Sequence, residues 1–181
     1  MLTPIQIAEA AECLYAAEKD RVQIRALTQF MEMDMTDAYA IQKSWVDRRL
    51  ADGERVVGYK IGLTSKAMQL AMNIDTPDYG VLTDAMVFKN GSTLSAGEFL
   101  DPRIESEFAF VLKSPLYGEF VSIEEVMRAT EYIQPALELI SARSYRVDPE
   151  TGYTRNVYDT IADNAANAGI ILGGERFSPN D

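Results

Sequence analysis

Hydrophobic positions recur at helical spacing through the first 50 residues of the chain. Thr3 and Pro4 are typical of the cap and first position of a helix, and the apolar stripe that follows runs to about residue 20. A second stripe, for which we predict Thr36 as the cap, runs to about Leu50. The sequence therefore predicts two N-terminal helices, whose apolar faces serve as core or as contacts between subunits.

Beyond residue 53 the period of the pattern changes from helical to two, which indicates strands. In RVVGYKIGL (residues 55–63), Val57, Tyr59 and Ile61 share one face, and Lys60 lies on the other between two glycines. A lysine flanked by glycines on its own face has open space beside it, which suits a ligand. A strand lysine that only extends its charge into solvent is the common alternative.

The run RIESEFAFVL (residues 103–112) predicts a further strand, in which Glu105 and Glu107 project from the same face. Two carboxylates this close repel, and burying them is costly unless a cation compensates. Glu138 adds a third acid from another apolar run, IQPALELI. We predict that these three carboxylates lie on two buried strands and form a site for a hard divalent cation, which prefers oxygen ligands. The alternative is an ordinary solvated strand face.

Turn residues divide the remaining segments. NIDTPDYG, from Asn73 to Gly80, predicts a turn that contains Asp78, and Asn90-Gly91 predicts the turn of a hairpin. Ser122 begins a capping box, which predicts a short helix to about residue 130. In DTIADNAANAG, small and amide residues either surround a pocket or cap a tight helix before the strand GIILGG.

Composition narrows the possible chemistry. The 181 residues include 28 acidic and 17 basic side chains, a formal net charge of −11. Nucleic acid and anionic membranes require a basic footprint, so we expect neither as a partner. Histidine is absent, which excludes Ser-His-Asp and Cys-His catalysis. Acid–base chemistry near neutral pH is then left to carboxylates, lysine, tyrosine or metal-bound water.

The length suits one domain with a substantial core. The single cysteine, Cys13, excludes an intrachain disulfide and a Cys-rich zinc site, and its helical context predicts a core position. No stretch approaches the roughly 20 apolar residues of a membrane span, and no secretory signal opens the chain. We therefore expect a cytoplasmic protein without a membrane partner.

Five segments, in order, carry a resemblance to a known enzyme family. They are GYKIGLTSKAMQ, PDYG, RIESEFAFVL, PALELI and DTIADNAANAGIILGG. Their order and spacing resemble the hydratase/decarboxylase branch of the fumarylacetoacetate hydrolase superfamily from about residue 7 to the C-terminus. The region DPETGYTRNVYDTIADNAANAG is most similar to the members that hydrate a dioate in the breakdown of homoprotocatechuate, an aromatic compound.

The resemblance implies an α+β fold, in which N-terminal helices (residues 1–52) precede a fumarylacetoacetase-like catalytic domain (residues 53–181) built as a mixed β-sheet roll. Family members continue past ILGG, so we expect the C-terminal part of the roll to be missing from this chain. A homo-oligomer is the implied assembly.

The resemblance also implies that Glu105, Glu107 and Glu138 hold Mg²⁺ or Mn²⁺. It implies that Lys60 and Asp78 are catalytic residues, with roles that the sequence leaves interchangeable.

The implied reaction adds water to a 2-hydroxy-2,4-dienoate that carries a second carboxylate. Arg103 or Arg143 is a candidate to hold that distal carboxylate. Two alternatives remain open: a decarboxylase of 2-oxo-3-hexenedioate with the same metal site, and a catalytically incomplete subunit that acts through assembly.

Overall fold

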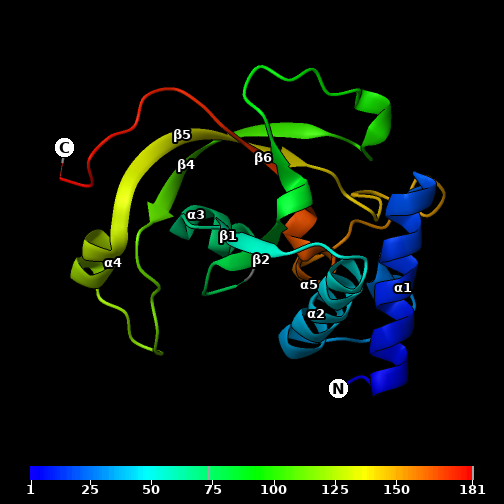
Figure 1. The fold of residues 1–181 in the computed structure, drawn as a ribbon. Coiled ribbons are helices and arrows are strands. Elements are labelled where there is room, and N and C mark those ends of the chain that lie inside the picture. Colours follow the sequence, from blue (N-terminus) through cyan, green and yellow to red (C-terminus); the bar gives the residue numbers. More distant parts are fainter. Residues whose placement is uncertain (73, 181) are drawn as a thin grey trace.

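The structure, a computed structural model, describes residues 1–72 and 74–180. Its helices are α1 (Pro4–Asp20), α2 (Met35–Ala51), α3 (Lys66–Ala71), α4 (Ile123–Ala129) and α5 (Val157–Ala162). Its strands are β1 (Val56–Gly62), β2 (Asp78–Thr83), β3 (Val87–Phe88), β4 (Arg103–Leu112), β5 (Thr130–Ile140) and β6 (Asn167–Leu172). Figure 1 shows α1 and α2 side by side at one end and α4 at the other. None of the helices in the described ranges is long and apolar enough to cross a membrane.

The strands form two sheets. One contains β1 and β2, which pair antiparallel, and the other has the order β3-β6-β5-β4. In the larger sheet β3 and β6 are parallel, whereas the other pairs are antiparallel. Strands β4 and β5 form one long curved pair (Figure 1). The prediction of N-terminal helices followed by mixed β-sheet is thus confirmed.

The main core lies between α1, α2, β2 and α5. Leu14 from α1, Ile41 and Trp45 from α2, and Ile161 from α5 are almost completely buried. Removing such side chains from water contributes roughly 1.5–3 kcal/mol each, which holds the N-terminal helices against the rest of the chain. Cys13, which we expected in this core, is exposed. It lies next to Leu14 in sequence, about 100° around the helix from the buried face.

The second helix begins earlier than predicted, because its cap is Asp34 and not Thr36. The Asp34 side chain accepts a hydrogen bond from the Asp37 N–H at 2.9 Å. The Asp37 side chain accepts one in return from the Asp34 N–H at 3.3 Å. Aspartate and threonine are both favourable caps, and this reciprocal pair satisfies two donors that the start of a helix leaves free.

Two turn predictions need correction. Asp78, expected in a turn, is the first residue of β2 and pairs with Gly62 of β1. A turn does form at Asn90-Gly91, but it closes no hairpin, because β3 pairs in parallel with β6. Asn73, the first residue of the predicted NIDTPDYG turn, lies outside the described residues.

Strand β4 is more exposed than predicted. Glu105 and Glu107 on one face are exposed, and so are four large apolar side chains on the other face. These four, which we call the β4 apolar face, are Ile104, Phe108, Phe110 and Leu112. Among the described residues β4 is an edge strand that pairs with β5 alone. The expected burial of both acid-bearing strands is therefore seen only around Glu138 in β5.

Replacing Asp34 with alanine should lower the free energy of unfolding by about 1 kcal/mol, because the hydrogen bond that the Asp34 side chain accepts from the Asp37 N–H is lost. Urea denaturation measures the change. The control is Thr36→Ala, at an exposed position of the same turn, which should stay within about 0.5 kcal/mol of the parent. Equal effects of the two substitutions would contradict the assignment of the cap.

Candidate metal centre

Strands β4 and β5 bring three carboxylates together. Their register places Glu105 directly opposite Glu138, and Glu107 follows two residues along β4. Directly opposed side chains on neighbouring strands lie close enough to interact. One carboxylate oxygen from each residue lies within 4.8 Å of the other two. The cluster expected from the sequence is therefore assembled by strand pairing.

Glu138 is the buried member of the cluster. Its residue is 6% exposed, whereas Glu105 and Glu107 are open to solvent. The pKa of the Glu138 carboxyl is raised to about 7, mainly by burial. The positive charge of Lys60 lowers this pKa in part, and the two neighbouring glutamates raise it further. Near neutral pH, this carboxyl is therefore close to the midpoint of its titration when no cation is bound.

Lys60 reaches the cluster from the smaller sheet. Its ammonium nitrogen Nζ lies 3.6 Å from Glu138 Oε1. At this separation the contact is an ion pair and is too long for a hydrogen bond. The Lys60 side chain is only 15% exposed. It therefore points toward Glu138 and does not merely extend its charge into solvent.

Gly62 provides space for the groups beside it. The β1–β2 register places Gly62 opposite Asp78. A Cβ atom at Gly62 would lie 2.2 Å from Asp78 Oδ1 and 3.0 Å from Lys60 Nζ. The carboxylate and the ammonium group therefore share the volume that the absent side chain leaves free. At Gly62, the open space predicted beside Lys60 is instead occupied by Asp78.

Two buried oxygens of the site have unused hydrogen-bonding capacity. Asp78 is 3% exposed, and burial raises the pKa of its carboxyl although Lys60 partly opposes this. Among the described residues, neither Asp78 Oδ1 nor Glu138 Oε1 has a hydrogen-bond partner. Buried polar atoms are normally satisfied, so these oxygens indicate a place for a ligand or water. An all-oxygen donor set with excess negative charge fits a hard divalent cation.

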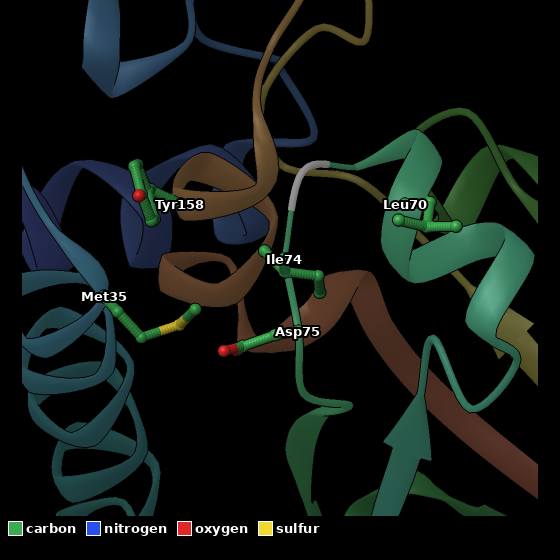
Figure 2. Close-up of a pocket in the computed structure, with 5 residues that line it drawn as sticks. All are labelled: Met35, Leu70, Ile74, Asp75 and Tyr158. Atoms are coloured by element: carbon green, nitrogen blue, oxygen red, sulfur yellow. The ribbon is translucent and has the colours of Figure 1, made fainter.

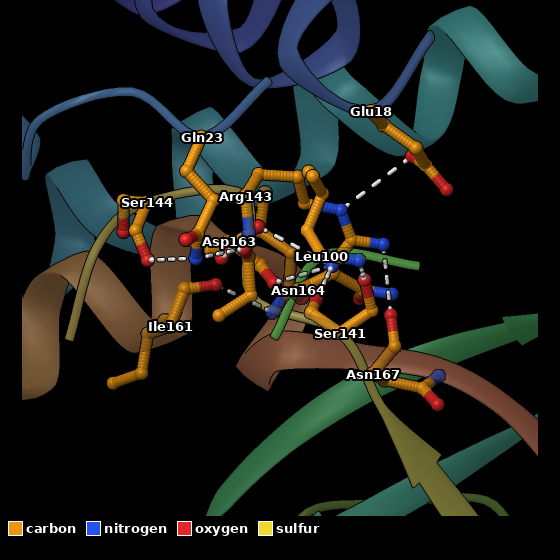
Figure 3. A network of polar contacts seen from close by, with 12 residues as sticks. Glu18, Gln23, Leu100, Ser141, Arg143, Ser144, Ile161, Asp163, Asn164 and Asn167 are labelled. Atoms are coloured by element: carbon orange, nitrogen blue, oxygen red, sulfur yellow. Dashed lines mark hydrogen bonds and ion pairs between the residues drawn. The ribbon is translucent and has the colours of Figure 1, made fainter. Parts of the chain in front are cut away.

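Arg143, one of the two arginines considered for the distal carboxylate, is occupied elsewhere (Figure 3). It is 1% exposed, and its guanidinium carbon lies 4.7 Å from the centre of the Trp45 ring. It donates to the backbone carbonyls of Asn167 at 2.9 Å and Asp163 at 3.3 Å. Ion pairs with Glu18 and Asp163 complete its surroundings. Arg143 is therefore a structural residue.

Arg103 remains at the surface of β4. Strand alternation places it on the same face as Glu105 and Glu107. Its side chain is 56% exposed and pairs with Asp101 at 3.6 Å. It is thus the arginine that stays accessible near the carboxylates.

Two hollows differ in their relation to the cluster. The first has a volume of about 420 Å³ and lies between α2, α3 and α5, lined by Met35, Leu70, Ile74, Asp75 and Tyr158 (Figure 2). Its described lining includes none of the three glutamates and neither Lys60 nor Asp78. The second, of about 430 Å³, lies along β4, β5 and β6 and includes Glu107 in its lining. Only the second adjoins the carboxylates.

Known proteins resemble this chain over almost all of its length, although no family model matches it. It is 51% identical over 172 residues to the 2-oxo-hept-4-ene-1,7-dioate hydratase of Escherichia coli, covering 94% of this chain and 64% of that protein. It is 39% identical over 175 residues to the 2-hydroxypent-2,4-dienoate hydratase of Pseudomonas putida, covering 96% and 76%. The chain thus spans less than two thirds of the length of the Escherichia coli relative.

Two solved structures share the fold. Both are 4-oxalocrotonate decarboxylase from Pseudomonas putida G7, one complexed with magnesium and adipate and the other with calcium and acetate. Their TM-scores are 0.90 and 0.89, with sequence identities of 32% and 33%. Each match covers 99% of this chain and 66% of the solved chain.

Replacing Gly62 with alanine should destabilise the protein by about 1–3 kcal/mol, because the new methyl group overlaps Asp78 Oδ1 and crowds Lys60 Nζ. Gly58→Ala is the matched control in the same strand. Its Cβ would meet only Leu82 Cδ1 at 3.8 Å, an ordinary contact. Urea denaturation of both variants tests the prediction, and a tolerated Gly62→Ala would contradict the close packing described here.

The contribution of Glu138 to metal-free stability should fall as pH rises. Its folded pKa of about 7 lies above its ordinary value of 4.5, so the folded state binds this proton more tightly than the unfolded state does. The contribution is complete below the unfolded pKa and is lost as pH rises through about 7.

Unfolding in urea with EDTA, at about pH 5 and about pH 8, measures this effect. The free energy of unfolding of Glu138→Gln minus that of the parent should be larger at about pH 8 than at about pH 5, because only the parent loses stability as Glu138 ionises. Glu131→Gln, at an exposed position of the same strand, serves as control. A parent–variant difference independent of pH would contradict the raised pKa.

Proposed function

The chain belongs to the family of the dienoate hydratases and their related decarboxylase, and we propose that it acts as a metal-dependent hydratase. The observation that carries the proposal is the cluster of three carboxylates within 4.8 Å, with the Lys60 ammonium 3.6 Å from one of them. The 51% identity to a 2-oxo-hept-4-ene-1,7-dioate hydratase supports a seven-carbon dicarboxylate as substrate. The product would be 4-hydroxy-2-oxoheptanedioate.

Glu105, Glu107 and Glu138 would hold Mg²⁺ or Mn²⁺. Their oxygen donors suit either ion, and the unpartnered Glu138 Oε1 supports a ligand at this position. When bound, the cation would supply Lewis-acid stabilisation of negative charge on the substrate's oxygens. The solved decarboxylase with magnesium supports Mg²⁺ as the first choice.

Lys60 and Asp78 would move the protons. Conversion of the 2-hydroxy-2,4-diene to the 2-oxo-3-ene takes a proton from the 2-hydroxyl group and places one on C5, and Lys60 Nζ is our candidate carrier. Water then adds with its hydroxyl at C4 and a proton at C3. The raised pKa of Asp78 favours a carboxyl that exchanges protons closer to neutral pH. The two roles are interchangeable within the proposal.

Arg103 is our candidate to bind the distal carboxylate of the substrate. It lies on the glutamate-bearing face of β4, and its exposed guanidinium can form paired hydrogen bonds with a carboxylate. Asp101 would have to release it when the substrate binds.

The main rival is decarboxylation of 2-oxo-3-hexenedioate with the same residues, which the similarity to 4-oxalocrotonate decarboxylase favours. The second rival is a catalytically incomplete subunit that acts through assembly. The open β4 apolar face supports it.

We also propose a domain division, an oligomeric state and a cellular location for this protein. Residues 1–52 form a helical segment and residues 53–181 a catalytic domain of fumarylacetoacetase-like type. Exposed apolar side chains on an edge strand favour association, so the β4 apolar face supports a homo-oligomer. A cytoplasmic location stays a prediction from the sequence, for which cell fractionation is the test.

The direct test follows the ultraviolet absorbance of 2-hydroxyhepta-2,4-diene-1,7-dioate with Mg²⁺ and then with EDTA. Metal-dependent loss of absorbance with formation of the 4-hydroxy-2-oxo product is the expected result. Carbon dioxide release from 2-oxo-3-hexenedioate without hydration would favour the decarboxylase instead. Inactivity with both substrates, together with entry into a larger particle on size-exclusion chromatography with a longer relative, would favour the assembly role.

Replacing Glu105 with alanine should remove the Mg²⁺ dependence and reduce activity by at least about a hundredfold, because one of three metal-binding carboxylates is lost. Glu131→Ala is the matched control, since Glu131 is an exposed glutamate of β5 outside the cluster. Mn²⁺ binding measured by electron paramagnetic resonance should weaken in the first variant alone. Unchanged metal affinity and activity in Glu105→Ala would rule out the assigned site.

A further inference from the structure

A short left-handed turn separates α5 from β6. Asn164, Ala165 and Ala166 have φ angles of +51°, +52° and +55°. This region is unfavourable for residues with a Cβ atom and is rarely adopted by alanine. Three such residues in succession persist only where the surrounding structure holds them.

Buried contacts from the end of β5 hold the left-handed turn. The guanidinium group of Arg143 donates to the carbonyls of Asp163 and Asn167, the residues on either side of the turn (Figure 3). The Ser141 N–H donates to the Ala166 carbonyl at 2.9 Å. The turn is thus fixed to the segment that directly follows β5, the strand that carries Glu138.

Asparagine side chains of the turn and of the residue after it form hydrogen bonds with β2. The Asn164 side chain accepts from the Val81 N–H at 2.7 Å and donates to the Val81 carbonyl at 3.0 Å. The Asn167 side chain donates to the same carbonyl at 3.2 Å. A Cβ atom at Gly80 would lie 2.6 Å from the Asn164 carbonyl oxygen, so the turn can approach this closely only because residue 80 is glycine.

These contacts connect the two halves of the candidate site. Gly80 is opposite Lys60 in the small sheet, and β6, which follows the turn, places Ile170 opposite Glu138 in the large sheet. In the described part of the chain the two sheets share no strand pairing. The side-chain amide of Asn164 instead supplies the pair of hydrogen bonds that a neighbouring strand would make.

We propose that the left-handed turn is a positioning device, in which Asn164 sets the separation between Lys60 and Glu138 by tying β2 to the sheet that carries the glutamates. The expected change in kcat rests on the proposed function, whereas the expected change in the Lys60–Glu138 separation does not depend on turnover. Among the hydrogen bonds and ion pairs of the described residues, none joins Asn164 to Lys60 or to the three glutamates, so it is a positioning residue and not a catalytic one.

The test is Asn164→Gly in the full chain. Glycine accepts the positive φ angle without strain, so the substitution removes the two hydrogen bonds between the Asn164 side chain and the Val81 backbone. In a crystal structure of the variant, the Lys60 Nζ to Glu138 Oε1 separation should lengthen beyond its present 3.6 Å. Because a misplacement of about 1 Å can cost on the order of a hundredfold in rate, we expect kcat to fall at least about tenfold. KM and the Mn²⁺ dissociation constant should stay within about threefold, since the metal ligands are unchanged.

Asn156→Ala is the matched control. Asn156 is also an asparagine of this segment, but its side chain caps α5 through the N–H groups of Tyr158 and Asp159 and has no contact with β2 in the hydrogen bonds described. It should lower the melting temperature while leaving kcat within about twofold of the parent, since helix capping contributes to stability alone.

Gly80→Ala tests the same contact from the opposite side. Its methyl group must push β2 away from the Asn164 carbonyl, so it should reproduce the longer Lys60–Glu138 separation and the kcat loss. The inference is overturned if both variants keep the parental separation and kcat. If the parent turns over none of the substrates, the proposed function fails, and the crystallographic separations alone decide the positioning role.

Discussion

Mutual repulsion among three carboxylates is the constraint on which the rest of the site depends. The pairing of β4 with β5 places Glu105 opposite Glu138, an arrangement of like charges that neighbouring strands normally avoid. Burial of Glu138 adds a desolvation cost, which is visible in its raised pKa. Lys60 compensates part of this charge at 3.6 Å. The remaining negative charge favours the binding of a divalent cation.

The groups that face the glutamate cluster come from a different sheet than the glutamates. Lys60 and Asp78 lie on the β1–β2 pair, whereas the glutamates lie on β4 and β5. Their relative placement therefore depends on packing between sheets and not on a hydrogen-bonded strand register. Small residues allow this packing: Gly62 leaves room for the ammonium and carboxyl groups, and Gly80 allows the left-handed turn to reach β2. Such contacts tolerate little change in volume.

Sequence patterns succeeded where short-range physics decides the outcome. Alternation placed Glu105 and Glu107 on one face of a strand whose observed bounds, Arg103–Leu112, match the predicted run. The same reasoning failed for the cap of α2, because Asp34 and Thr36 have similar local preferences. It also failed for the hairpin at Asn90-Gly91, because the partner of β3 lies about 80 residues away in sequence. Strand β4 is exposed because it lies at the edge of the sheet, and a local sequence pattern does not predict the position of a strand in its sheet.

The sequence by itself determined which chemistry is available. Because histidine is absent, it left carboxylates, lysine, tyrosine and metal-bound water as the groups available for acid–base chemistry near neutral pH. Its acids spaced two apart on an apolar strand predicted where carboxylates gather. Only the tertiary structure decided which of them meet. It paired Lys60 with Glu138, buried Arg143 among backbone carbonyls and left Arg103 exposed near the carboxylates. The physical reason is that periodicity depends on the bonds between neighbouring residues, whereas these contacts join residues far apart in the chain and are selected by packing of the whole fold.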